Sequence, residues 1–191
     1  MAFLTESEAR QRAGRITKRL RKTAVEALIE SISVDETFDV FLSHSSNEDE
    51  SILLGVKEYL EDQELSVYVD KYNDPDLSPE IVTLETANRL RKRLMNSRVL
   101  IFVYSQHSIL SRWMPWELGF MDGKSGKVGV LPVVKIAGLT YDREEYLSLY
   151  PYIDKAKARN SEAEYFWIRE SPKKYARLDR WIKGAEEISD R

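Results

Sequence analysis

The chain contains no cysteine and only two histidines in 191 residues. The lack of cysteine excludes a disulfide scaffold, thiol catalysis and thiolate metal sites, and it fits a reducing compartment. A zinc site would need both His44 and His107 together with carboxylates, and neither histidine has a partner at helical ligand spacing. We therefore expect no metal centre.

Long apolar runs and a strong charge of one sign are also missing. No segment approaches the roughly 18 apolar residues that a membrane-spanning helix needs, and the N-terminus lacks the apolar region of a secretory signal. A net charge of −3 argues against a general nucleic-acid binder. We expect a cytoplasmic protein that binds neither membranes nor nucleic acids and has a core large enough for one globular domain.

The N-terminal segment 5–32 has the pattern of one amphipathic helix, because its apolar residues recur every three or four positions. Between Arg10 and Lys22 there are seven basic residues and no acidic one. Such a face can bind a partner helix, an anionic surface or RNA. Alternatively, it is the solvated side of a helix that docks on the domain or on a second copy. We expect residues 1–35 to form this helical extension and residues 36–191 to form the main domain.

Four apolar segments predict strands, at residues 38–43, 65–69, 99–104 and 128–134. Helical patterns separate them, which predicts βαβ crossovers and a parallel sheet. A fifth strand is expected between residues 70 and 98 or near 165–168. Pro132 has no N–H for a ladder, so we place its strand at a sheet edge. Short helices are expected over residues 142–150 and after Ser171-Pro172.

Polar residues follow the ends of three predicted strands. They are Ser43, His44 and Ser45 after the first strand, Asp70 after the second and Ser105 after the third. In open α/β sheets, ligands bind at the edge where the carboxyl ends of parallel strands meet. Each residue alone is explained by turn or cap chemistry. Their convergence on one edge nevertheless predicts a binding site. The acidic residues 48–50 are expected in the first turn of the next helix.

Trp113 and Glu117 lie four residues apart, just past the third strand. In a helix they share one face, which places an indole and a carboxylate at the same sheet edge. The structural alternative is a solvated helix glutamate beside a tryptophan that anchors the core. A phosphate loop does not explain the region, because the run from Gly119 to Ser125 has three residues between its glycines where four are required.

Four motifs in the chain resemble those of the Toll/interleukin-1 receptor (TIR) domain family, particularly its bacterial members. They are residues 38–45, similar to the opening strand; 67–70, similar to the second strand that leads into the BB loop; 97–118, similar to strand D and the Trp-x-x-x-Glu helix; and 130–133, similar to the closing edge strand. The resemblance covers residues 37–135. It implies an α/β, flavodoxin-like parallel sheet of about five strands flanked by helices, with the N-terminal helix as an extension.

The resemblance implies one of two activities. Many family members cleave NAD+ at the nicotinamide–ribose bond, whereas others are adaptors that act only through TIR–TIR contacts. In enzymatic members the glutamate of Trp-x-x-x-Glu is catalytic, and it corresponds to Glu117 here. The residues expected to contact substrate are Ser43, His44, Ser45, Asp70 and Trp113.

Three positions depart from the family pattern. His44 stands where some members carry an aromatic residue, and Ser45 stands where some carry an arginine. The usual BB-loop glycine is missing between Lys71 and Glu80. We therefore expect substrate contacts and a BB loop that differ from those of other members.

A single carboxylate is sufficient for the implied reaction. Nicotinamide leaves as a neutral pyridine from a cationic pyridinium, so no general acid is required, whereas a glycosidase must protonate its leaving group. One carboxylate can stabilise the oxocarbenium-like ribose through its charge and through hydrogen bonds to ribose hydroxyls. Capture by water gives ADP-ribose, and capture by an adenine nitrogen or a ribose hydroxyl gives a cyclic ADP-ribose.

The sequence thus predicts an NAD+ glycohydrolase or cyclase of the bacterial immune (anti-phage) type, with NAD+ as substrate and no cofactor. Family members often complete the pocket with a neighbour's BB loop, so the 5–32 helix is expected to help self-association. Two alternatives stay open. One is a non-catalytic TIR interaction module in which Trp113 and Glu117 are structural. The other is a base-modifying or nucleoside-processing enzyme that uses the same sheet edge.

Overall fold

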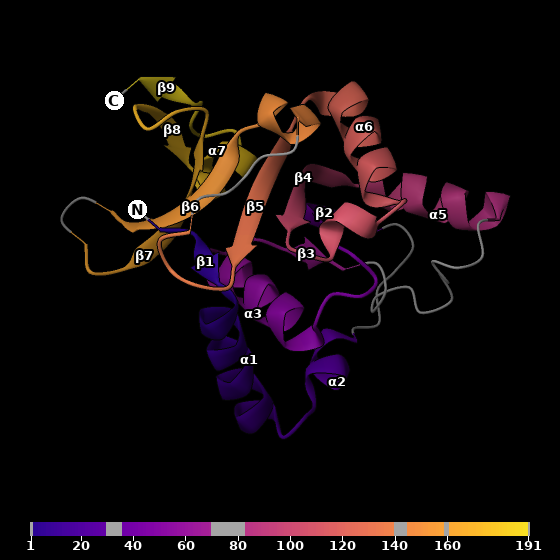
Figure 1. Ribbon diagram of the computed structural model, residues 1–191. Coiled ribbons are helices and arrows are strands. Elements are labelled where there is room, and N and C mark those ends of the chain that lie inside the picture. The colour runs from indigo at the N-terminus through magenta and orange to yellow at the C-terminus, as the bar shows by residue number, and fades with distance from the viewer. Residues whose placement is uncertain (1, 30–35, 70–82, 140–144, 159–160, 191) are drawn as a thin grey trace.

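The structure is a computed structural model that describes residues 2–29, 36–69, 83–139, 145–158 and 161–190. Its strands are β1 (Leu4–Thr5), β2 (Phe38–Ser43), β3 (Val67–Tyr68), β4 (Ser97–Tyr104), β5 (Val128–Val134), β6 (Tyr152–Lys157), β7 (Glu164–Arg169), β8 (Lys174–Arg177) and β9 (Ser189–Asp190). They form one sheet in the order β3-β2-β4-β5-β6-β7-β8-β9, and β1 pairs with β5 (Figure 1). Pairing is parallel from β3 to β6 and between β1 and β5, and antiparallel from β6 to β9.

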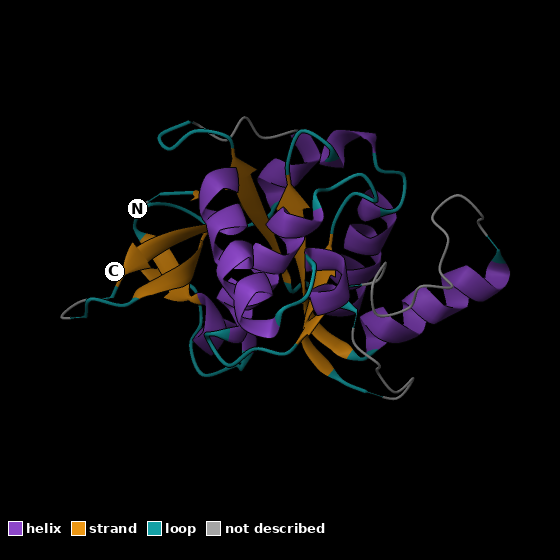
Figure 2. Ribbon diagram, turned by 90° about the horizontal axis from the view of Figure 1, so that it is seen from below, coloured by secondary structure: helices purple, strands orange, loops and turns teal. Residues whose placement is uncertain are grey.

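Helices cover both faces of the sheet (Figure 2). They are α1 (Glu6–Leu20), α2 (Ala24–Leu28), α3 (Glu50–Glu61), α5 (Leu84–Met95), α6 (Met114–Ser125) and α7 (Leu178–Ile182), with 3₁₀ turns at Ser108–Leu110 and Glu145–Leu149. Side chains of α1, α2, α3 and α7 share one buried cluster, and those of α5 and α6 share the other. Within the described ranges, no helix has the length and hydrophobicity needed to cross a membrane.

The central strands are apolar because they are buried on both faces. Successive residues of a strand point to opposite faces. Val99 and Ile101 of β4 accordingly join the cluster under α1 and α3, whereas Leu100 and Phe102 join the cluster under α6. All four side chains are at most 1% exposed. The predicted α/β, flavodoxin-like architecture with a parallel core is therefore confirmed.

The placement of β5 at a sheet edge was wrong, since this strand is paired on both sides. The N–H of Val130 donates to the carbonyl of Pro151 on the β6 side, with N···O 2.9 Å. The backbone nitrogens of residues two apart in a strand point to the same neighbouring strand. The nitrogen of Pro132, two residues after Val130, therefore also points towards β6. The register between β5 and β6 consists of the single pair Val130–Tyr152. The missing donor of Pro132 therefore falls where this ladder does not need it.

The C-terminal part of the chain extends the sheet beyond the five strands that were expected. The strand near 165–168 is present as β7, but it is antiparallel to β6. The helix expected after Ser171-Pro172 is wrong over its first half, because Lys174–Arg177 is β8 and the helix α7 begins only at Leu178. Of the expected helix at 142–150, the described part is a 3₁₀ turn. Ser78 and Pro79 have the residue types of an N-cap and a first helical position, and the helix start that this pair predicts lies outside the described residues.

The N-terminal segment forms two helices and not one. Arg21 adopts a left-handed conformation with φ 54° and ends α1, and Thr23 starts α2 with a capping box to Glu26. The apolar stripe of α1 packs on α3, where Ala9 and Ala13 are at most 1% exposed. Docking on the domain, one of the alternatives for this segment, is thus observed. Residues 30–35 lie outside the described ranges, so the division of the chain at residue 35 stays a prediction.

Glu8 fastens α1 to the sheet and should make this contact sensitive to pH. Its carboxylate completes the capping box with Thr5 and accepts a hydrogen bond from Lys155 of β6. Partial burial by itself raises the pKa of Glu8, but the hydrogen bonds from Lys155 and Thr5 outweigh it and hold the pKa below its ordinary value of 4.5. A depressed pKa stabilises the fold above pH 4.5, and this contribution is lost as the pH falls through the folded-state pKa.

We expect Glu8→Gln to lower the melting temperature near pH 7. The difference between the two proteins should shrink as the pH falls below 4.5 through the folded-state pKa of Glu8, because the wild-type carboxyl then becomes protonated as well. The measurement is the melting temperature of both proteins across that range. A difference that stays constant with pH would contradict this role of Glu8.

Candidate active site at the ends of β2 and β4

The first turn of α6 presents Glu117 and Trp113 on one face. The N–H of Glu117 donates to the carbonyl of Trp113, with N···O 2.9 Å, and Pro115 lies in the first turn where its missing N–H is not needed. Met114 and Leu118 anchor the helix in the core and are at most 4% exposed. This anchoring holds the Glu117 side chain inside the protein, where it is 2% exposed. The interpretation of Glu117 as a solvated surface residue is therefore excluded.

Ser43, the last residue of β2, is hydrogen-bonded to Glu117. Its Oγ donates to Oε2 of the carboxylate at 2.6 Å, and both side chains are buried. A hydrogen bond to a carboxylate is shorter and stronger than one between neutral groups. The contact joins residues 74 positions apart in the chain. The predicted convergence of the first strand end and the Trp-x-x-x-Glu helix is thus present, and the carboxylate is held in one orientation.

His44 and Ser45 continue from Ser43 into the turn after β2. The Nδ1 atom of His44 lies 3.1 Å from the carbonyl oxygen of Leu42, which can only accept, so Nδ1 carries the proton. The Oγ of Ser45 accepts from the N–H of Asn47 at 3.3 Å. Both side chains are at most 7% exposed. The structure places them beside the buried carboxylate pair along the chain, and their contact with substrate stays a prediction.

Trp113 and Asp70 complete the set of predicted residues. The indole of Trp113 is half-buried and packs edge-on against Trp116, with ring centroids 5.4 Å apart. It also packs against the core cluster under α6, so it anchors this helix whatever else it contacts. Asp70 lies outside the described residues.

The residue that the sequence interpretation missed is Glu48. It was assigned with Asp49 and Glu50 to the start of a helix, but Asp49 is the N-cap and α3 begins at Glu50. Glu48 precedes the helix and is only 4% exposed. Its Oε2 accepts a hydrogen bond from Oγ of Ser105, the polar residue after β4. One sequence signal could have identified Glu48. Asp is strongly preferred at the N-cap position, and with Asp49 as the N-cap the preceding residue, Glu48, lies outside the helix.

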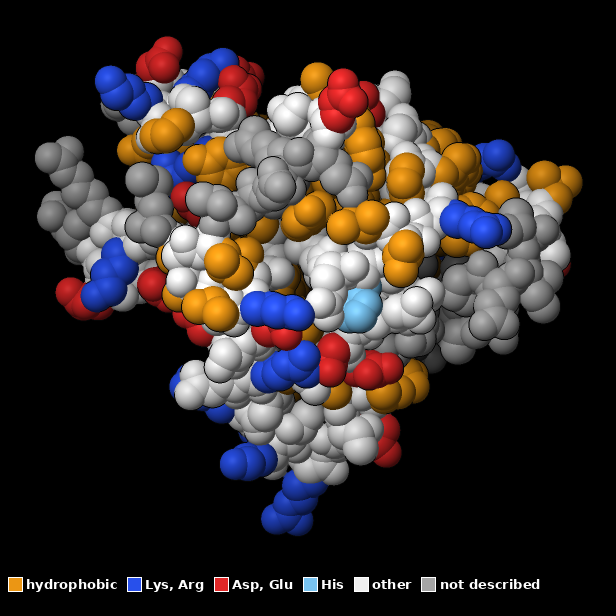
Figure 3. Space-filling view, in the orientation of Figure 1, with side chains coloured by type: hydrophobic (Ala, Val, Ile, Leu, Met, Phe, Trp, Pro, Cys, Tyr) orange, Lys and Arg blue, Asp and Glu red, His pale blue; other side chains and the backbone are white. Residues whose placement is uncertain are grey.

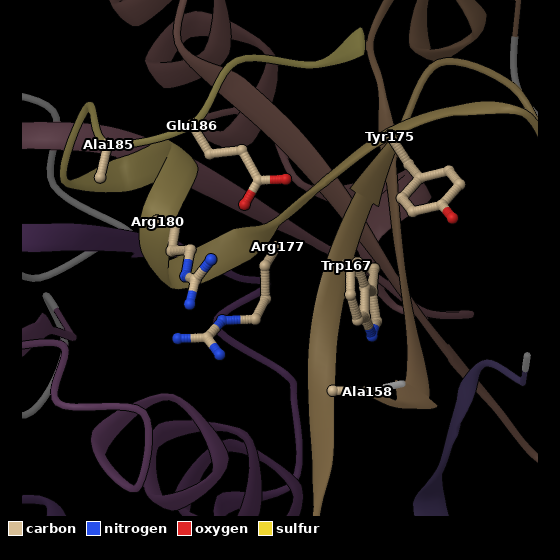
Figure 4. Close-up of a pocket in the computed structure, with 7 residues that line it drawn as sticks. All are labelled: Ala158, Trp167, Tyr175, Arg177, Arg180, Ala185 and Glu186. Atoms are coloured by element: carbon tan, nitrogen blue, oxygen red, sulfur yellow. The ribbon is translucent and has the colours of Figure 1, made fainter. Parts of the chain in front are cut away.

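A separate cavity of about 750 Å³ lies in the antiparallel part of the sheet (Figure 4). Its lining includes Trp167, Tyr175, Arg177, Arg180 and Glu186. The guanidinium of Arg177 is already bound to both carboxylate oxygens of Asp179, at 2.6 Å each. Neither Ser43 nor Glu117 lines this cavity, so it is distinct from the candidate active site. Among the described residues, no three His, Asp or Glu side chains are grouped so that they could hold a metal ion.

Comparison with known proteins gives three matches. The sequence model of the TIR domain matches residues 40–166. A protein of Bacillus cereus (strain MSX-D12), described as a probable 3′ cyclic ADP-D-ribose synthase, ThsB′, is 41% identical over 163 residues, which cover 85% of this chain and 84% of that protein. A Cytobacillus dafuensis protein, provisionally named cyclic ADP-D-ribose synthase TIR2, is 34% identical over 95 residues, which cover 48% of this chain and 25% of that protein. The chain therefore belongs to the TIR domain family.

Proposed function

We propose that this protein cleaves NAD+ at the nicotinamide–ribose bond and closes the remaining ADP-ribose into a ring, with Glu117 as the catalytic residue. The buried hydrogen bond between Ser43 and Glu117 supports this assignment most directly, because it presents one fixed carboxylate at the carboxyl ends of parallel strands. The two relatives named as cyclic ADP-D-ribose synthases support the same reaction. A role in bacterial anti-phage defence follows from the family resemblance and is part of the proposal.

The chemistry requires a negative charge and no acid. The bond between the ribose C1″ and the pyridinium nitrogen breaks, and its electron pair stays on nicotinamide, which leaves as a neutral molecule. Positive charge then develops on the ribose, and the Glu117 carboxylate stabilises it in surroundings that exclude water. Ser43 keeps the carboxylate in the orientation that this requires.

A cyclic product requires that a nucleophile within the same molecule reach C1″ before water does. The name of the Bacillus cereus relative places the new bond at a 3′ position. For this chain we propose the corresponding step, in which the oxygen of a 3′-hydroxyl bonds to C1″ and its proton is released to solvent. A site that keeps water away from C1″ favours ring closure over hydrolysis.

The test is to incubate the concentrated protein with NAD+ and to separate the products by chromatography. We expect nicotinamide and a cyclic ADP-ribose in equal amounts. ADP-ribose alone would change the proposal from a cyclase to a hydrolase. Turnover of free nucleosides but not of NAD+ would favour a nucleoside-processing enzyme. Self-association without any turnover would favour a non-catalytic interaction module.

We also propose that copies associate through the basic end of α1. Lys and Arg side chains gather there (Figure 3), and the exposed ones are Arg15, Lys18, Arg19, Arg21 and Lys22. The segment from Arg10 to Lys22 contributes +7 to a chain whose net charge is −3, so the remainder carries −10. The basic end of one copy is therefore attracted to the acidic remainder of another.

We expect Lys22→Glu to weaken self-association several-fold at about 50 mM salt and to have little effect at about 500 mM, where charges are screened. Sedimentation velocity measures the self-association of each protein at the low and the high salt concentration. The matched control is Lys173→Glu, which makes the same charge change at an exposed position on the loop between β7 and β8. Equal effects of the two substitutions would contradict a specific role for α1.

A further inference from the structure

A second buried hydrogen bond lies near the Ser43–Glu117 pair along the chain and joins the turn after β2 to the turn after β4. Glu48 closes the turn that follows β2, and Ser105 opens the turn that follows β4. The Oγ of Ser105 donates to Oε2 of Glu48, and the two side chains are 5% and 4% exposed. The N–H of Glu48 also donates to the carbonyl of Ser45 at 3.0 Å. Glu48 therefore ties the turn after β2 to the turn after β4.

The turn after β4 leads directly to the catalytic helix. The N–H of Ser105 donates to Oγ of Ser108 at 3.2 Å, and that Oγ donates to the carbonyl of Ser105 at 2.7 Å. Ser108 begins the 3₁₀ turn, and Ser111, directly after it, accepts from the N–H of Met114 at 3.3 Å. Met114 is the first residue of α6. A continuous set of hydrogen bonds thus runs from Glu48 to the turn of α6 that carries Glu117.

We propose that Glu48 and Ser105 are positioning residues that set the separation between the substrate-binding turn after β2 and Glu117 on α6. This proposal rests on the proposed function of Glu117. A buried carboxylate is costly unless its hydrogen bonds are made, and a fully satisfied buried network is rigid. The segment from Ser43 to Glu48 is fixed to the segment from Ser105 to Glu117 at two points, Ser43–Glu117 and Glu48–Ser105, and two contacts prevent the rotation that one alone would allow.

The role assigned to Glu48 depends on its acceptor oxygen and not on its charge. Glutamine retains an acceptor for Ser105, whereas alanine does not. We expect Glu48→Ala to lower kcat/KM for NAD+ by about 10²-fold, the effect of misplacing a catalytic group by about 1 Å. Glu48→Gln should restore kcat/KM to within a few-fold of the wild type. Ser105→Ala should match Glu48→Ala, and the double variant should be no worse than either single one, because both remove one contact.

A buried ion pair in the antiparallel part of the sheet provides the control. Nε of Arg169 lies 2.8 Å from each carboxylate oxygen of Asp154, and both residues are at least as buried as Glu48. We expect Asp154→Ala to lower the melting temperature and to leave kcat/KM unchanged for the folded protein. This variant separates a loss of stability from a loss of positioning.

Amide hydrogen exchange gives a second measurement that does not depend on turnover. Glu48→Ala should speed exchange in residues 105–118, and Glu48→Gln and Asp154→Ala should not. The proposal is overturned if Glu48→Gln is as damaging as Glu48→Ala, which would make the charge essential. It is also overturned if Glu48→Ala changes only the melting temperature. If the wild type releases no nicotinamide, the proposed function fails, and the exchange pattern still decides whether Glu48 positions α6.

Discussion

Replacing Glu117 with glutamine should reduce nicotinamide release by about 10² to 10³-fold or more, the effect of removing a group that stabilises charge in a transition state. Glutamine has nearly the same shape and can accept the hydrogen bond from Ser43 that the carboxylate accepts now. The substitution thus removes the negative charge and preserves the packing. We expect the melting temperature to change little, so the loss of activity reports on chemistry and not on folding.

Initial rates of nicotinamide release at saturating NAD+ measure this effect. Ser43→Ala is the matched variant, because it keeps the charge and removes the group that orients it. We expect it to lose about 10- to 100-fold, and less than Glu117→Gln, since one hydrogen bond of this kind is worth roughly 1.5–3 kcal/mol. Full activity of Glu117→Gln would refute the assignment of Glu117 as the catalytic residue.

Gly55→Ala should destabilise the fold strongly, although the same change usually stabilises a helix. Gly55 lies in α3 where α1 crosses it, and an added Cβ would be 2.1 Å from the carbonyl oxygen of Ala9. That atom belongs to the backbone and cannot rotate away, so α1 must move as a whole. Overpacking of this kind typically costs about 1–3 kcal/mol and sometimes more. It outweighs the gain of about 0.5–1 kcal/mol that alanine brings to a helix interior.

The control for this prediction is Gly14→Ala in α1, where an added Cβ meets nothing within 4 Å. We expect Gly14→Ala to raise the free energy of unfolding and Gly55→Ala to lower it, so the two substitutions should have opposite signs. Urea denaturation measures both. Equal stability of the two variants would show that α1 does not pack against α3 as closely as the structure indicates.

The parts of the fold that the sequence could predict are those governed by local periodicity. The run Val99–Tyr104 has the composition of a strand buried on both faces, and β4 is that strand. The spacing of Trp113 and Glu117 places them one helical turn apart, as found in α6. The polar residues after β2 and β4 meet at one sheet edge because parallel strands share a direction.

The parts that it could not predict depend on contacts between distant residues. The Ser43–Glu117 bond needs the register of β2 against β4 and the rotation of α6, and no local pattern contains these. Pro132 wrongly indicated an edge strand. A proline is tolerated in this paired strand because β6 pairs with β5 only at Val130, and no local pattern shows where that pairing ends. The segment Lys174–Arg177 follows a good helix cap, yet pairing with β7 and β9 makes it a strand.

The pairing of β1 with β5 has a consequence for how the chain reaches its native state. Leu4 and Thr5 leave the ribosome well before their partners, Val133 and Val134, which are synthesised nearly 130 residues later. Lys155, the partner of Glu8, is synthesised later still. Such long-range contacts form late, because the entropy cost of closing the large loop between the partners comes before the contact can stabilise the chain. The N-terminal strand is therefore expected to add to the sheet last, after the parallel core has formed without it.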